Sequence, residues 1–210
     1  MNKGIFISLE GGEGVGKTTQ LNFIKQWFES HDLPYIITHE PGGTPLGEEI
    51  RQILKYSKYQ ILPKAELLLF NAARAELIEE VIKPSLNNRI NVIADRFFDS
   101  SIVYQSYGRG LELNDVVDIC MYATSQIEPD ITFWLDLSPK EAFERKFGPD
   151  AGDRFEHTGL EFHNKVYEGY KKLASQYSRI KVIDASKSEK EVSEQIDYYL
   201  TQKFLLNKDI

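Results

Sequence analysis

The chain has 210 residues, of which 41% are hydrophobic and 27% charged, with 14 glycines and 8 prolines. This length and composition fit one globular domain, expected over residues 1–210, and exclude collagen-like, low-complexity and disordered chains. The 32 acidic residues outnumber the 25 lysines and arginines, giving a net charge of −7. This sign argues against nucleic acid as a partner, because phosphate backbones attract positive charge.

The expected elements alternate between short apolar runs and longer segments of helical period, which predicts βαβ units around a parallel sheet. In chain order they are a strand over 4–10, a helix over 17–30, a strand over 35–39, helices over 45–56 and 64–82, a strand over 90–95, a helix over 114–125, a strand over 131–137, helices over 139–146 and 159–177, a strand over 180–184 and a helix over 189–204. The strands are almost continuously hydrophobic, as expected when helices cover both faces of a five-stranded sheet.

Two further features bear on location and on mobile parts. The only cysteine, Cys120, cannot form an internal disulfide, which favours a reducing compartment. The first apolar stretch, residues 4–9, is too short for a secretion signal or a membrane span, so we expect a cytoplasmic protein that does not contact membranes. Gly148, Pro149 and Gly152 interrupt the helical pattern, which predicts a short lid at about residues 147–158.

Residues 11–18 read Gly-Gly-Glu-Gly-Val-Gly-Lys-Thr and fit the pattern G-x-x-x-x-G-K-[ST]. In this phosphate-binding loop the backbone N–H groups cradle phosphates, the lysine reaches the terminal phosphates and the hydroxyl binds Mg²⁺. The alternative is a glycine-rich turn, but the match lies between a predicted strand and a predicted helix, as the motif requires. We therefore predict binding of ATP with Mg²⁺ by Gly11, Gly12, Glu13, Gly14, Val15, Gly16, Lys17, Thr18 and Thr19.

A GTPase switch is disfavoured, because the chain contains neither Asp-x-x-Gly nor Asn-Lys-x-Asp. The strand over 90–95 ends in Asp95-Arg96, at the carboxyl edge where open α/β sheets bind ligands. Asp95 can hold Mg²⁺ and Arg96 can bind a phosphate with two N–H groups. The alternative is an ion pair that caps a helix.

Several motifs together resemble the thymidylate kinase family, in its bacterial type. They are Leu9 to Thr19, Glu40 to Thr44, Phe70 to Arg74, Asp95 to Ser101, Tyr104-Gln105, Gly108 to Gly110 and Asp153 to Glu156. The resemblance runs from about Lys3 to about Tyr199. It implies a P-loop kinase fold, a homodimer, and transfer of the γ-phosphoryl group of ATP to dTMP, giving dTDP and ADP for dTTP biosynthesis.

The resemblance also implies roles for individual residues. Lys17 would stabilise the moving phosphoryl group, Thr18 and Asp95 would organise magnesium, and Glu13 would face the sugar and phosphate of dTMP. Arg51 and Arg96 would bind the monophosphate, with Arg96 near the reacting groups. Phe70 would stack on thymine and Arg74 would reach a base carbonyl, while Ser101, Tyr104 and Gln105 would complete the pocket around base and sugar.

The residues support part of this assignment on their own. Phe70 and Arg74 are four positions apart, so one helix face presents an aromatic ring and a guanidinium together, as a planar base with carbonyl oxygens requires. Alternatives remain: Phe70 in a hydrophobic core, Tyr104 as a packing residue and Ser101 as a helix cap. His39 stands where relatives often have arginine, and we interpret it as a strand-end histidine.

The catalytic arginine of the lid is left open. In one branch of the family an arginine stands inside the phosphate loop, but here that position is Gly14, so the resemblance implies a catalytic arginine supplied by the lid. The candidates are Arg145, which precedes the lid, and Arg154, which closes it. Two other functions also remain: a nucleotide kinase with a different acceptor, and a nucleotide-binding regulatory module without catalysis. The first would turn over another monophosphate, and the second would bind ATP without acceptor-dependent ADP formation.

Overall fold

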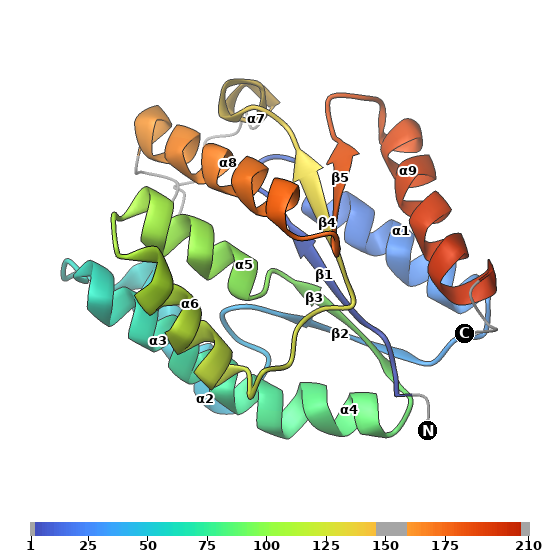
Figure 1. The fold of residues 1–210 in the computed structure, drawn as a ribbon, viewed down its shortest axis with the longest axis horizontal. Helices are drawn as coiled ribbons and strands as arrows, with labels where there is room; N and C mark the ends of the chain where they lie inside the picture. Colours follow the sequence, from blue (N-terminus) through green and yellow to red (C-terminus); the bar gives the residue numbers. More distant parts are fainter. Residues whose placement is uncertain (1–2, 146–158, 207–210) are drawn as a thin grey trace.

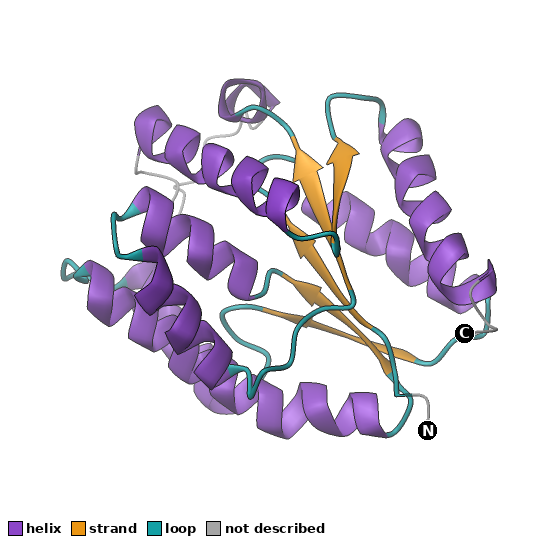
Figure 2. Cartoon of the chain, viewed as in Figure 1, coloured by secondary structure: helices purple, strands orange, loops and turns teal. Residues whose placement is uncertain are grey.

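The computed structural model describes residues 3–145 and 159–206, so the lid expected at about 147–158 lies outside the described residues. The described residues form a central sheet covered by helices on both faces (Figures 1 and 2). Among them, no helix is both long enough and apolar enough to cross a bilayer.

The sheet has five parallel strands in the order β2-β3-β1-β4-β5, which confirms the predicted fold class. The strand bounds are β1 (Phe6–Glu10), β2 (Tyr35–His39), β3 (Asn91–Asp95), β4 (Ile131–Asp136) and β5 (Ile180–Asp184). Strand β1 lies at the centre of the sheet, between β3 and β4. The chain forms β2 and β3 on one side of β1, and then β4 and β5 on the other side. This reversal of strand order opens a crevice at the carboxyl ends of the strands.

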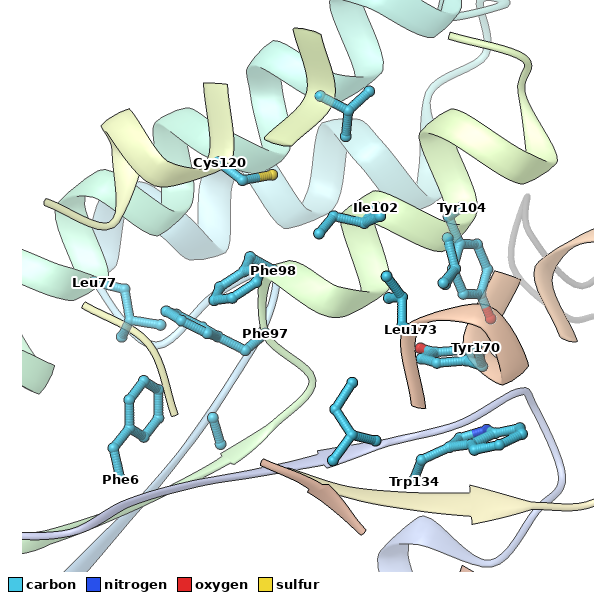
Figure 3. Packing of buried hydrophobic residues seen from close by; sticks show 14 of the residues in the cluster. Phe6, Leu77, Phe97, Phe98, Ile102, Tyr104, Cys120, Trp134, Tyr170 and Leu173 are labelled. Atoms are coloured by element: carbon cyan, nitrogen blue, oxygen red, sulfur yellow. The ribbon is translucent and has the colours of Figure 1, made fainter. Parts of the chain in front are cut away.

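Two hydrophobic cores lie on the two sheet faces, because alternate strand residues point to opposite sides. On β1, Phe6 belongs to one core, whereas Ile7 and Leu9 belong to the other. The Phe6 core is packed with aromatic rings, and Figure 3 shows Phe97 and Phe98 beside it. Burial on both faces explains why these strands read as almost continuous apolar runs.

Helices α1 (Lys17–Ser30) and α9 (Glu189–Thr201) cover one face of the sheet and pack against each other. The other face is covered by α3 (Pro63–Leu77), α6 (Leu113–Ala123) and α8 (Gly159–Gln176), with α2 (Pro45–Tyr56) packed on α3. Helix α7 (Pro139–Arg145) follows β4. A capping box at Ser188, closed by the Glu191 carboxylate, starts α9, which ends in a π-helical turn over Gln202–Leu206.

The helix expected over 64–82 is longer than predicted. After α3 the chain forms a π-helical turn over Ile78–Ile82 and continues as α4 (Lys83–Asn87). Pro84 lies in the first turn of α4, where a missing N–H costs little. The helical path therefore continues past the expected end at residue 82 to Asn87.

Residues 98–108 have no predicted element, yet they form α5 (Phe98–Ser101) followed by a π-helical segment, η2 (Ile102–Gly108). Nearly every residue from Phe98 to Ser106 is buried. A segment buried on all sides has no amphipathic stripe, so periodicity cannot reveal it. Its placement matters because it carries several of the predicted substrate residues.

Candidate active site

A cleft of about 710 Å³ opens at the carboxyl ends of the central strands. It brings together most residues predicted for nucleotide binding. Those that line it are Glu13, Gly14, Gly16, Lys17, Thr18, Arg51, Phe70, Arg74, Asp95, Arg96, Ser101, Tyr104, Gln105 and Arg145. Of the predicted residues, Gly11, Gly12, Val15 and Thr19 lie in the same loop or the first turn of α1 without lining the cleft. Arg154 lies outside the described residues.

The phosphate loop connects β1 to α1, as the motif requires. Gly14 and Gly16 have φ values of 74° and 97°, in the left-handed region where a side chain is strained. Gly16 is the N-cap of α1 and no side chain caps this helix, so its first N–H groups can bind an anion.

Lys17 lies in the first turn of α1 and its ammonium group turns back over the loop. Nζ donates hydrogen bonds to the carbonyl oxygens of Gly12 at 2.6 Å and Gly11 at 3.3 Å. Burial and the positive charge of Arg96 lower its pKa to about 8, and nearby carboxylates oppose the shift. A bound phosphate would favour the charged form of this lysine, because opposite charges stabilise each other.

Asp95 and Arg96 face the loop from the end of β3. Asp95 Oδ1 is buried and has no hydrogen-bond partner within the described residues. Arg96 donates to Glu13 Oε1 at 2.6 Å and to Ser100 Oγ at 3.1 Å. Its backbone has φ of 70°, a conformation that non-glycine residues rarely adopt and that active sites retain.

Glu10, the last residue of β1, holds this turn in place, and sequence reasoning assigned it no role. Its carboxylate is fully buried and accepts hydrogen bonds from the backbone N–H of Phe97 at 2.7 Å, from the Ser100 hydroxyl at 2.6 Å and from the Tyr170 hydroxyl at 2.8 Å. Burial and the charge of Asp99 raise its pKa to about 7. The signal in the sequence was a lone acid at the end of an otherwise apolar run.

Arg74 is in the cleft wall but is itself almost completely buried, at 1% exposure. Its N–H groups are held by Glu40 at 2.6 and 3.0 Å, by Asn71 Oδ1 at 2.7 Å and by Ser101 Oγ at 2.9 Å. Burial raises the pKa of Glu40, and the charge of Arg74 opposes that shift. The pair fixes α3 to the end of β2, and Glu40 is a second residue that sequence reasoning left without a role.

Phe70 lies on α3, and Ser101, Tyr104 and Gln105 lie on the α5–η2 segment. All four line the cleft. Tyr104 lies under Arg96, whose guanidinium carbon is 5.4 Å from the ring centroid. Ser101 is the last residue of α5 and precedes η2, but its side chain makes no capping hydrogen bond to η2 and its hydroxyl instead accepts from Arg74. The helix-cap alternative for Ser101 is therefore wrong.

Two other predicted residues lie at the rim. Arg51 Nη1 donates to the Pro41 carbonyl at 2.8 Å. Arg145, at the end of α7, donates to the carbonyl oxygens of Ala185 at 2.8 Å and Ser186 at 3.2 Å. His39 ends β2 and lies 2.8 Å from Glu48 Oε1, which agrees with its interpretation as a strand-end histidine.

The strand order, the glycine loop before α1 and the cleft are those of the P-loop class of nucleotide-binding proteins. Comparison with known proteins specifies which one. Residues 9–196 match the thymidylate kinase family, and the chain belongs to this family, whose known activity is phosphoryl transfer from ATP to dTMP.

Individual relatives are similar over nearly the whole chain. A thymidylate kinase of Chlorobaculum tepidum is 43% identical over 202 residues, covering 91% of this chain and 94% of the relative. One of Carboxydothermus hydrogenoformans is 42% identical, covering 94% and 97%. One of Dehalococcoides mccartyi is 44% identical, covering 90% and 92%.

Proposed function

We propose that this cleft binds ATP with Mg²⁺ at the phosphate loop and dTMP beside Phe70, and that it transfers the γ-phosphoryl group directly between them. The observation that carries this proposal is the single cleft lined by both Lys17 and Phe70. An anion-binding loop and an aromatic ring with polar neighbours, lining one cleft, suit two nucleotides placed phosphate to phosphate.

The residues present fit a magnesium ion. Magnesium in such sites keeps several waters and takes few protein ligands beside the substrate phosphates. It therefore does not require a cluster of three or more His, Cys, Asp or Glu side chains, and none occurs within residues 3–145 and 159–206. Asp95 supplies a buried carboxylate oxygen without a hydrogen-bond partner in that part of the chain, and Thr18 supplies a hydroxyl in the first turn of α1. When bound, magnesium would neutralise charge on the transferring phosphates.

The chain's own groups position and neutralise the reactants. An oxygen of the dTMP phosphate attacks the γ-phosphorus, the bond to the β-phosphate oxygen breaks, and ADP leaves, so no protein nucleophile is needed. Lys17 exchanges its two carbonyl contacts for phosphate oxygens of ATP. Arg96, held by Glu13 and Ser100, and Arg51, at the rim, bind the acceptor phosphate.

The acceptor base is held between α3 and the α5–η2 segment. Phe70 stacks on the ring, and Ser101 and Gln105 provide polar groups at its edge. Glu40, Asn71 and Ser101 accept hydrogen bonds from the N–H groups of Arg74. A base carbonyl that binds Arg74 must therefore compete with these acceptors or share one of the Arg74 hydrogens with them. Tyr104 lies on the sugar side, next to Arg96.

We also propose that the protein is a cytoplasmic homodimer. Exposed apolar side chains occur on three helices of one face, including Ile53 of α2 at 49%, Leu68 of α3 at 57% and Tyr122 of α6 at 88% exposure. Pairing of this face in a second copy would bury them. Sedimentation velocity of wild type and Leu68→Glu tests the dimer, because a charge at a paired apolar face favours the monomer.

The function is tested by measuring ADP formation from ATP and Mg²⁺ with dTMP, dUMP, dCMP, dGMP, AMP and thymidine supplied one at a time. We expect strong preference for dTMP. Strong turnover with another monophosphate would keep the phosphate end of the site and discard the assignment of the base pocket. ATP binding without acceptor-dependent turnover would point to a regulatory module instead.

A further inference from the structure

One face of α3 carries an acidic residue, an aromatic residue and an arginine in succession. Glu66, Phe70 and Arg74 are spaced by four residues, so they lie one above the other along the helix. The two charged residues each bind a polar residue of the neighbouring α5–η2 segment: Arg74 donates to Ser101 and Glu66 accepts from Gln105. Phe70 therefore lies between two hydrogen-bonded links that join the walls of the base pocket.

The link at Glu66 determines the orientation of the Gln105 side chain. The Glu66 carboxylate is buried and lies 2.8 Å from Gln105 Nε2. A carboxylate accepts hydrogen bonds and does not donate them, so the amide nitrogen of Gln105 must face Glu66. The amide oxygen must then point away from it.

The amide oxygen is the group left for a ligand. Gln105 is 1% exposed and lines the cleft, and its Oε1 has no hydrogen-bond partner within the described residues. A buried acceptor without a partner is destabilising, and a ligand N–H can supply the missing hydrogen bond.

Arg109 forms an ion pair with the Glu66 carboxylate. Its Nε and Nη2 donate to the Glu66 oxygens at 3.2 and 3.3 Å. Its guanidinium carbon lies 4.7 Å from the ring centroid of Phe162 in α8. A charged partner offsets the cost of burying the carboxylate, so the acceptor character of Glu66 is built into the fold.

We propose that Glu66 is a positioning residue for selection of the acceptor base: it orients the Gln105 amide so that the carbonyl oxygen accepts a hydrogen bond from a ring N–H of the base. This inference rests on the proposed function. Thymine and uracil carry a hydrogen on N3, whereas cytosine has a bare acceptor at that position. An oriented acceptor therefore attracts the first two and faces the third with an unpaired oxygen.

The test is the ratio of kcat/KM for dTMP to kcat/KM for dCMP in wild type and Glu66→Gln. An amide at position 66 can pair with Gln105 in either orientation, which lets the Gln105 nitrogen turn toward cytosine. We expect the ratio to fall about tenfold or more, mainly through KM, in line with one misoriented hydrogen bond. The ratio of kcat/KM for dTMP to kcat/KM for dUMP stays unchanged, because uracil presents the same N3–H. KM for ATP also stays unchanged.

The exchange of the two side chains provides the matched rescue. In the double variant Glu66→Gln/Gln105→Glu, the amide at position 66 donates to the carboxylate at position 105, whose second oxygen is again an acceptor. We expect its ratio of kcat/KM for dTMP to kcat/KM for dCMP to return to within about threefold of the wild-type ratio. This difference is smaller than the change expected from the loss of one hydrogen bond. The exchange moves the negative charge from position 66 to position 105 without changing the net charge, and the moved charge affects both acceptors alike, which leaves the ratio intact.

An unchanged ratio in a folded Glu66→Gln variant overturns the inference, as does a double variant that folds but does not discriminate. If the single variant does not fold, the double variant alone decides. Failure of the proposed function is distinguishable, because wild type itself would then not prefer dTMP.

Discussion

The hydroxyl of Tyr170 donates a hydrogen bond to Glu10 Oε2 at 2.8 Å, which joins helix α8 to the strand that precedes the phosphate loop. Burial and the Glu10 charge raise the pKa of Tyr170 well above its usual value of 10, so it remains a donor. The Tyr170 ring stacks on Trp134 of β4, with centroids 5.8 Å apart (Figure 3). Through Phe97 and Ser100, the same carboxylate holds the turn that carries Arg96.

The pKa of Glu10 predicts how stability depends on pH. Because it is raised from 4.5 to about 7 in the folded chain, the folded state binds more protons than the unfolded state between these values. The contribution of this group to stability is therefore complete below pH 4.5 and is lost as the pH rises through 7.

We expect the stability advantage of wild type over Glu10→Gln to fall by about 2 to 3 kcal/mol between pH 5 and pH 8. Urea unfolding of both proteins across this range measures it. Parallel stability curves would show that Glu10 is already ionised at pH 5.

Lys17→Ala should remove nearly all turnover and leave the fold intact. The ammonium group is the part of the side chain that reaches phosphate, and removal of a group that stabilises transition-state charge costs about 10²–10³ in kcat. Lys25→Ala is the matched control, because Lys25 lies on the same helix and is 49% exposed. Steady-state kinetics and thermal unfolding of both variants decide the matter, and a Lys17→Ala variant with wild-type activity would overturn the mechanism.

Arg154→Ala should lower kcat more than it raises KM for either substrate, because a lid arginine is expected to act mainly in the transition state. Arg145→Ala is the comparison, since Arg145 already binds the carbonyl oxygens of Ala185 and Ser186. Single-turnover and steady-state rates separate the two effects. An unchanged kcat in Arg154→Ala moves the catalytic role to Arg145 or Lys146.

Glu40→Gln should destabilise the fold, because it leaves the charge of the buried Arg74 with weaker partners. Removing one member of a buried ion pair costs about 3 to 5 kcal/mol. The control is Glu48→Gln: Glu48 pairs with His39 but is 46% exposed, and such pairs contribute less than about 1 kcal/mol. Urea unfolding at pH 7 compares the two, and equal losses would contradict a special role for the buried pair.

Local signals in the sequence were sufficient for the sheet and the phosphate loop. The bounds of β2, β5, α1 and α2 agree with those expected, because each begins and ends at a clear change of pattern. The helix expected over 64–82 instead contains a π-helical turn over Ile78–Ile82 and continues as α4 to Asn87, which the apolar pattern did not reveal. The segment over 98–108 was missed, because complete burial removes the periodicity that reveals a helix.

The sequence by itself determined the order of the strands and most helices and the glycine-rich loop between β1 and α1, and it predicted the types of residue proposed to meet the nucleotides, because these depend on hydrophobic pattern, glycine content and short motifs. Only the tertiary structure decided which buried acids do the positioning. Glu10, Glu40 and Glu66 look like ordinary acids in the chain, and their partners Tyr170, Arg74 and Gln105 lie 160, 34 and 39 positions away. A carboxylate acquires such a role from the donors that surround it after folding, which local sequence does not encode.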